Sequence, residues 1–113
     1  MSDDLTTALN TPPPVRVRVR MGTMWSGEQR FTHAFRIGRS AECQVVVPER
    51  VVSRVHAEVR LEAGRWWLID QQSTHGLHIN GSQVTRVPLQ EAVTVELGLG
   101  GPAVWLTVGD EIA

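Results

Sequence analysis

Hydrophobic and polar residues alternate one by one along much of this chain, which is the period of a β-strand with one buried face. The clearest stretch covers residues 15–20, where valine and arginine alternate without a break. A second candidate strand runs over 30–37, because Phe31, Phe35 and Ile37 share one parity. The pattern therefore predicts a chain of strands, and no capped helix of useful length is expected.

Turn residues separate the remaining predicted strands. Residues 55–61 alternate in the same way, and Ala63-Gly64 then leads into the apolar run 65–69, which predicts a hairpin. Asn80-Gly81 follows the short strand 77–79 and is a signal for a two-residue type I′ turn. Further short apolar runs occupy 45–47, 93–97 and 104–108. Many short strands between turn residues are typical of a β-sandwich.

Composition divides the chain into a tail and one domain. Residues 1–14 are polar and end in three prolines, which cannot join a strand ladder, so we expect a flexible N-terminal tail. Residues 15–113 form a segment of ordinary domain size. The acidic start is unlike a signal peptide, and no apolar run approaches the roughly 20 residues of a membrane span. We therefore expect a cytoplasmic location without membrane insertion.

Charge and cysteine content narrow the function classes. The net charge is −1, so nothing draws the chain as a whole to nucleic acid or to an anionic membrane, and no nucleic-acid partner is expected. All 11 basic residues are arginine, a side chain suited to bidentate recognition of carboxylate and phosphate. Cys43 is the single cysteine, so no internal disulfide is possible.

Three loop motifs carry the candidate chemistry, and each leaves or enters a predicted strand. They are Gly38-Arg39-Ser40, then Ser53-Arg54-Val55-His56-Ala57, then Ser73-Thr74-His75-Gly76 followed by Asn80-Gly81. No single motif is specific. Their order and spacing within an all-β chain resemble the forkhead-associated (FHA) domain family, over roughly residues 15–109.

The resemblance implies a fold and a function. The implied fold is all-β, an FHA-type sandwich of two twisted, mainly antiparallel sheets with about eleven strands. The implied function is non-catalytic and needs neither cofactor nor metal: loops at one end bind a phosphothreonine peptide in Ser/Thr kinase signalling. The expected partner is a phosphothreonine-containing protein, either a Ser/Thr kinase or its substrate. Phosphothreonine carries about −1.5 to −2 charges, so its recognition requires a fixed guanidinium, hydroxyl donors and free backbone N–H groups.

Five residues are expected to contact the phosphopeptide. Arg39 and Ser53 match the family's phosphate-binding arginine and serine, and Arg54 places a second positive charge beside them. Thr74 is expected to contact the phosphate through its hydroxyl or backbone N–H. His75 stands where the family most often has asparagine. An imidazole cannot copy a bidentate amide, and it changes charge near neutral pH, so His75 is expected to alter peptide preference.

Five further residues are expected to support the loops. His56 lies on the polar parity of its predicted strand, and the resemblance gives it hydrogen bonds to neighbouring loops. Gly38 ends the strand before the arginine, and Gly76 supplies a backbone angle that other residues resist. Asn80 and Gly81 are interpreted as hairpin geometry rather than as peptide contacts.

Two catalytic alternatives have weak support. Ser53, His56 and Asp70 have the residue types of a hydrolase triad, but no Gly-x-Ser-x-Gly elbow is present, and the serine and histidine are too close in sequence. A metal site would need the poorly spaced set His33, Cys43, His75 and His78.

The main alternative is an FHA-like interaction domain that binds its partner independently of phosphate. Such a domain would use a sheet face or the tryptophans at positions 25, 66, 67 and 105. Trp66 and Trp67 are adjacent on one predicted strand, so one is expected in the core and the other near the surface. A further hypothesis concerns the tail: some bacterial FHA proteins bind their own phosphorylated tail, and Thr6 or Thr7 would be the residue to do so here.

Overall fold

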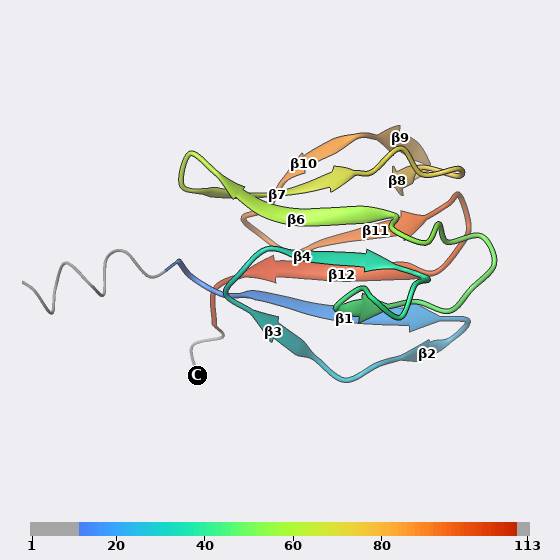
Figure 1. The fold of residues 1–113 in the computed structure, drawn as a ribbon, viewed down its shortest axis with the longest axis horizontal. Helices are drawn as coiled ribbons and strands as arrows, with labels where there is room; N and C mark the ends of the chain where they lie inside the picture. The colour runs from blue at the N-terminus through green and yellow to red at the C-terminus, as the bar shows by residue number, and fades with distance from the viewer. Residues whose placement is uncertain (1–11, 111–113) are drawn as a thin grey trace, which may run out of the picture.

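The computed structural model describes residues 12–110. Residues 1–11, with Thr6 and Thr7, and residues 111–113 lie outside this part, so most of the predicted tail does too. Within residues 12–110, twelve strands form two sheets that pack face to face (Figure 1). In chain order the strands are β1 (Val15–Met21), β2 (Met24–Trp25), β3 (Gln29–Phe31), β4 (Phe35–Gly38), β5 (Val45–Val46), β6 (Ala57–Glu62), β7 (Arg65–Asp70), β8 (Leu77–Ile79), β9 (Ser82–Val84), β10 (Arg86–Pro88), β11 (Val93–Leu97) and β12 (Ala103–Val108).

The sheet topology confirms the predicted all-β sandwich. The seven-stranded sheet has the order β2-β1-β12-β11-β8-β9, and β3 also pairs with β1. The five-stranded sheet has the order β10-β7-β6-β4-β5, in which only β4 and β5 run parallel. The described part therefore has one strand more than the expected eleven or so. The edge partner of β1 is split into two short pieces, β2 and β3.

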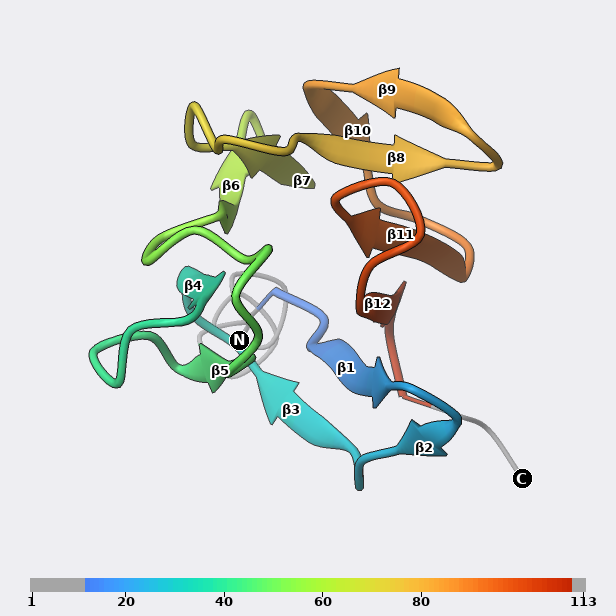
Figure 2. The same cartoon turned by 90° about the vertical axis from the view of Figure 1, so that its right-hand side faces the viewer.

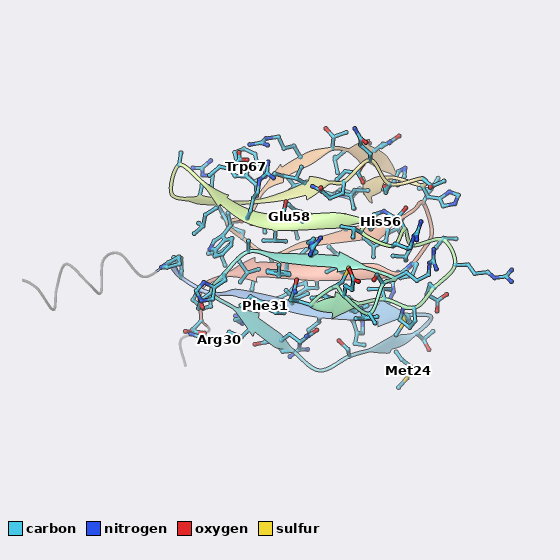
Figure 3. The ribbon with its side chains drawn as sticks, in the orientation of Figure 1. Met24, Arg30, Phe31, His56, Glu58 and Trp67 are labelled. Carbon is cyan, nitrogen blue, oxygen red and sulfur yellow. The ribbon has the colours of Figure 1, made fainter. Side chains whose placement is uncertain are left out.

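Both sheets contribute to one hydrophobic core, as the alternating pattern predicts. The valines of β1 are at most 3% exposed, and the arginines between them lie on the outer face. Trp66 is 2% exposed, whereas Trp67 lies on the outer face beneath the Arg86 guanidinium, 4.4 Å from the ring centre. The adjacent tryptophans therefore point to opposite faces, which confirms the sequence prediction (Trp67 is labelled in Figure 3).

The predicted strand over 30–37 is wrong as a single element. It is divided between β3 and β4, which belong to different sheets, because the chain crosses the sandwich at 32–34. Phe31 and Phe35 nevertheless stack, with ring centroids 4.1 Å apart. Shared parity correctly showed that both rings face inward, but it carried no information about the sheet to which each belongs.

The Asn80-Gly81 turn has the predicted type I′ backbone, and the Ala63-Gly64 turn of the other predicted hairpin has the same backbone. Asn80 and Gly81 have φ angles of 51° and 84°, and Ile79 pairs with Ser82 across them. Ala63 and Gly64 have φ angles of 53° and 80° between the paired residues Glu62 and Arg65. Positive φ at both central residues is the type I′ geometry, which matches the twist of the flanking strands.

The loops that carry the three motifs meet at one end of the sandwich, away from the N-terminal segment (Figures 1 and 2). The β4–β5, β5–β6, β7–β8 and β11–β12 connections all lie at this end (Figure 2). At the opposite end the Trp66 indole N–H donates to the Pro13 carbonyl at 2.9 Å, and the Gly109 N–H donates to the Pro14 carbonyl at 2.7 Å. These bonds hold the last two prolines of the predicted tail against the fold.

Candidate functional site

A pocket of about 190 Å³ opens among the loops at this end. It brings together four of the five residues expected to contact a phosphopeptide, namely Arg39, Ser53, Thr74 and His75. They come from three separate segments: the end of β4, the β5–β6 loop and the β7–β8 loop. The remaining lining residues are Arg50, Val51 and Val52. The lining thus contains two guanidinium groups and no carboxylate.

Arg39 is held in place before any ligand arrives. Its backbone N–H donates to the Ser53 carbonyl at 2.9 Å, and its side-chain Nε–H donates to the Val52 carbonyl at 2.9 Å. Among the described residues, no carboxylate lies within ion-pair distance of its guanidinium. The four N–H groups on its two terminal nitrogens therefore remain available to an anion.

Ser53 connects two of the loops. Its Oγ accepts a hydrogen bond from the backbone N–H of Thr74 at 3.0 Å. Because the oxygen serves here as acceptor, the hydroxyl hydrogen is left to donate to a ligand. The bond also fixes the β7–β8 loop, with Thr74 and His75, beside the β5–β6 loop.

His56 braces these loops from within. It is fully buried at the loop-bearing end (Figure 3). Its Nδ1 accepts from the Ser53 backbone N–H at 3.1 Å, and its Nε2 lies 2.8 Å from the Gly76 carbonyl oxygen. A carbonyl can only accept, so Nε2 carries the proton and the imidazole is the neutral tautomer. Burial also lowers the pKa of His56, which favours the same neutral form.

The placement of His56 on the polar, outward parity is wrong. His56 precedes β6, which begins at Ala57, so the two-residue alternation of that strand does not extend to it. Its side chain turns inward because its two ring nitrogens find partners on two loops. A buried polar group of this kind is stable only when its hydrogen bonds are made.

The β7–β8 loop is closed by a second set of polar contacts. The Asp70 carboxylate accepts from the Ser73 backbone N–H at 3.2 Å and from the Ser73 hydroxyl at 2.5 Å. The Ser73 Oγ in turn accepts from the Gly76 N–H at 2.9 Å. Asp70 therefore binds Ser73, and His56 binds the backbone N–H of Ser53 rather than its hydroxyl. These bonds do not assemble the hydrolase triad considered for Ser53, His56 and Asp70.

Gly38 and Gly76 permit close approaches between segments. A Cβ on Gly38 would lie 2.2 Å from the Arg54 carbonyl oxygen, a contact that only glycine avoids. Gly76 has φ +77°, and a Cβ there would lie 2.8 Å from the Gln83 side chain. Asn80 and Gly81 form the tip of the β8–β9 hairpin and are not among the residues that line the pocket.

Two arginines differ from expectation. Arg54 has an exposed side chain that is not part of the pocket lining, while its carbonyl accepts from Ser40 N–H at 3.1 Å. Arg50 lines the pocket, although no motif indicated it. The one signal in the sequence was its place three residues before Ser53. Adjacency in sequence is a poor guide here, because the path of the irregular β5–β6 loop decides which side chains face the pocket.

Residues 12–110 contain neither a metal-ligand cluster nor a membrane-spanning helix. Between residues 12 and 110, no three side chains of His, Cys, Asp or Glu gather as metal ligands would. No helix in that same range is long and apolar enough to cross a membrane.

Comparisons with known proteins identify the family. The family model for the FHA domain matches residues 35–98. The crystal structure of Mycobacterium tuberculosis Rv1747 FHA-1 is 34% identical, with a TM-score of 0.74, over 87% of this chain and 99% of that one. The FhaA FHA domain, solved in complex with the intracellular domain of Rv3910, is 25% identical, with a TM-score of 0.66, over 81% of this chain and 98% of that one. The chain therefore belongs to the FHA domain family, whose members are generally non-catalytic interaction modules.

Two further comparisons complete the picture. Mycobacterium tuberculosis EmbR, solved in complex with a low-affinity phosphopeptide, is 15% identical, with a TM-score of 0.69, over 96% of this chain and 30% of that one. At this identity the likeness shows the fold alone. A comparison with curated protein sequences found no significant match.

Proposed function

We propose that this FHA domain binds phosphothreonine in the pocket formed by Arg39, Ser53, Thr74 and His75. The observation that carries the proposal is the anchored Arg39 guanidinium, which lies beside a serine hydroxyl free to donate, in a pocket without a carboxylate. A phosphate dianion requires such a preorganised set of donors. The structure of the FhaA FHA domain with a partner domain supports this proposal by family likeness.

Each donor has a part in the proposed complex. The terminal nitrogens of Arg39 bind two phosphate oxygens, and the Ser53 hydroxyl donates to one of them. Arg50, at the pocket wall, supplies additional positive charge, and Arg54 does so from the exposed surface next to Ser53. A charge-assisted hydrogen bond contributes roughly 1.5–3 kcal/mol, and ordering and desolvation offset much of the total. We therefore expect micromolar affinity.

Apolar contact at the rim distinguishes phosphothreonine from phosphoserine in this proposal. Val51 lines the pocket and is 39% exposed, so its side chain is available to the γ-methyl group of threonine. Burial of one methyl group contributes about 0.8 kcal/mol, which corresponds to roughly a fourfold preference. His75, in place of the usual asparagine, contacts the peptide backbone beside the phosphothreonine.

The proposed partner is a protein phosphorylated on threonine, either a Ser/Thr kinase or one of its substrates. Such signalling places the domain in the cytoplasm. The domain contributes recognition, and it performs no reaction on the phosphate.

Calorimetry with three matched peptides tests the proposal: one with phosphothreonine, one with phosphoserine and one without phosphate. We expect wild type to bind the phosphothreonine peptide most tightly, and Arg39→Ala to weaken that binding by tenfold or more, as the loss of one charged hydrogen bond implies. Arg36→Ala is the matched control, because Arg36 lies on β4, the strand that leads to Arg39, but is exposed on the outer face. Arg54→Ala tests the part assigned to Arg54.

The same titrations separate the two functions that the sequence left open. Equal affinity for the phosphorylated and plain peptides would refute phosphate recognition and favour a phosphate-independent interaction domain. Equal affinity for phosphothreonine and phosphoserine would remove the role of Val51 while leaving the phosphate pocket in place.

A further inference from the structure

The outer face of the seven-stranded sheet carries a cluster of arginine and tryptophan side chains away from the phosphate pocket. We call it the Arg–Trp face, and its members are Arg16, Arg18, Arg20, Trp25 and Trp105. Arg18 lies directly across from Trp105 in the β1–β12 register, and Arg20 lies across from Trp25 in the β1–β2 register. Four of the five residues, all except Arg20, line a groove of about 480 Å³.

The tryptophan rings hold the guanidinium groups in position. The guanidinium carbons of Arg16 and Arg18 lie 5.5 Å and 5.8 Å from the ring centre of Trp105, and that of Arg20 lies 5.8 Å from Trp25. Cation–π contacts of this length are attractive, because the guanidinium charge lies over the negative face of the ring. Stacking immobilises the arginines, so less conformational entropy remains to be lost when they bind a ligand.

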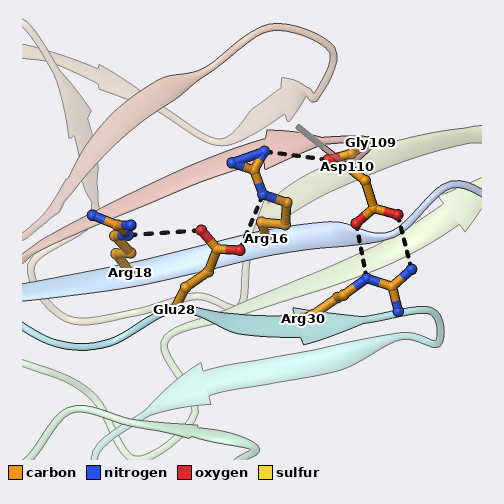
Figure 4. A network of polar contacts seen from close by, with 6 residues as sticks. All are labelled: Arg16, Arg18, Glu28, Arg30, Gly109 and Asp110. Atoms are coloured by element: carbon orange, nitrogen blue, oxygen red, sulfur yellow. Dashed lines mark hydrogen bonds and ion pairs between the residues drawn. The ribbon is translucent and has the colours of Figure 1, made fainter. Parts of the chain in front are cut away.

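An ion pair within the protein shows that these arginines can bind a carboxylate. The Glu28 carboxylate lies between two of them, 3.1 Å from Arg16 Nε and 3.7 Å from Arg18 Nε (Figure 4). Arg16 also donates to the Gly109 carbonyl at 3.5 Å, and the nearby Arg30 is paired with Asp110 (Figure 4). Among residues 12–110, the three guanidinium groups of the Arg–Trp face form ion pairs with one carboxylate, Glu28, which Arg16 and Arg18 share. The Asp110 carboxylate, which is paired with Arg30, also interacts electrostatically with Arg16.

The outer face of the other sheet provides an internal comparison. There Arg60 pairs with both Glu58 and Glu62, and Arg86 pairs with Glu62 while it stacks on Trp67. The two arginines are matched by two carboxylates, so that cluster is neutral. Arg36 and Arg65 are also exposed on that sheet, so the difference lies in the grooves rather than in the total charge. The groove of the Arg–Trp face is lined by two arginines and no carboxylate, whereas a groove of about 400 Å³ beside Trp67 includes Glu62 in its lining.

We propose that the Arg–Trp face is a second binding site, which takes an extended acidic segment of a protein partner. Arg16 and Arg18 are two residues apart on one strand, so they project from the same face roughly 6.5–7 Å apart. Acidic residues at alternate positions of an extended peptide have the same spacing, and each can pair with one guanidinium. An apolar side chain two residues further on would lie over Trp25, which is 45% exposed.

The site is distinct from the phosphate pocket but close enough for one partner to occupy both. Arg20 lines a pocket of about 300 Å³ together with Val51, and Val51 also lines the phosphate pocket. The proposal does not depend on phosphate recognition, because the acidic segment binds through carboxylates alone.

Calorimetry at low ionic strength with two unphosphorylated ten-residue peptides of equal composition tests the proposal. In one peptide two glutamates occupy alternate positions and a leucine follows two residues later; in the other the glutamates are adjacent and so point to opposite faces. We expect the first to bind more tightly and to weaken as salt is added. We expect Arg18→Gln to weaken its binding about two- to fivefold, the range for exposed ion pairs. Arg65→Gln, an exposed arginine on the other sheet, is the matched control and should have no effect.

Glu28→Gln is the decisive variant, because misfolding cannot imitate its expected result. Removal of the internal carboxylate frees both guanidinium groups, so this variant should bind the alternating peptide two- to fivefold more tightly than wild type. Equal binding of the two peptides, an unaltered affinity in Arg18→Gln, or no gain in Glu28→Gln would each overturn the proposal. Binding of a single-stranded oligonucleotide in place of the peptides would also overturn it and assign the face to nucleic acid.

Discussion

Replacement of Gly38 by alanine tests the close approach on which the phosphate pocket depends. The added Cβ would meet three backbone atoms: the Arg54 oxygen at 2.2 Å, the Arg54 carbonyl carbon at 2.8 Å and the Val55 Cα at 2.9 Å. Ordinary contact begins near 3.4 Å, so the end of β4 and the β5–β6 loop must separate by about 1 Å. Neither backbone can turn away as a flexible side chain could.

The size of the effect follows from the contacts on either side of Gly38. Overpacking costs about 1–3 kcal/mol. Separation also strains two hydrogen bonds, Arg39 N–H to the Ser53 carbonyl at 2.9 Å and Ser40 N–H to the Arg54 carbonyl at 3.1 Å. Each has a net value of about 0.5–1.5 kcal/mol. We therefore expect Gly38→Ala to lower the free energy of unfolding by about 2–6 kcal/mol, and Tm by about 8 °C or more.

Urea unfolding followed by tryptophan fluorescence measures this change, and Gly27→Ala is the matched control. A Cβ on Gly27 meets nothing within 4 Å, so that variant should stay within about 0.5 kcal/mol of wild type. If Gly38→Ala unfolded at the same urea concentration as Gly27→Ala, the close approach of Gly38 to the Arg54 backbone would not affect stability. The proposed reason for glycine at position 38 would then be wrong.

Three further predictions concern the turns and the loop bonds. Ala63 has a φ of 53°, a left-handed conformation that asparagine adopts at less cost than alanine. Ala63→Asn should therefore raise the free energy of unfolding by about 0.5–1 kcal/mol, whereas Asn80→Ala at the equivalent turn position should lower it. Thermal melts that moved in the same direction for both variants would contradict the reasoning. Burial lowers the pKa of His56, so as the pH falls the unfolded chain binds a proton on this histidine before the folded chain does. The contribution of His56 to the free energy of unfolding should therefore be constant above pH 6.5 and decline below it, by up to about 1.4 kcal/mol per pH unit. An equal decline in His56→Gln would rule out this histidine as the cause. Ser73→Ala removes the Asp70 contact and should cost about 1–3 kcal/mol in urea unfolding, with Ser82→Ala at an exposed position as its control.

Much of the candidate site could be predicted because its motifs are local. The order of Gly38-Arg39, Ser53 and Thr74-His75 indicated which loops to examine, and the structure brings these residues to one pocket. The predictions fell short where irregular backbone replaces a strand. Arg54 was included because it is adjacent to Ser53, yet its side chain lies outside the pocket lining, whereas Arg50 lines the pocket without belonging to any motif.

The sequence alone predicted most of the strands, their inward faces, the two hairpins and the type I′ turn at Asn80-Gly81, because alternation and positive φ are properties of a few neighbouring residues. Only the tertiary structure decided how distant segments meet. It divided 30–37 between two sheets, and it turned His56 inward to join its neighbour Ser53 to Gly76, which lies 20 residues after His56 in the chain. It also left the groove of the Arg–Trp face lined by arginine and tryptophan without a carboxylate, whereas Glu62 lines the groove beside Trp67 on the other sheet. These features depend on which surfaces pack together, and no local pattern encodes that.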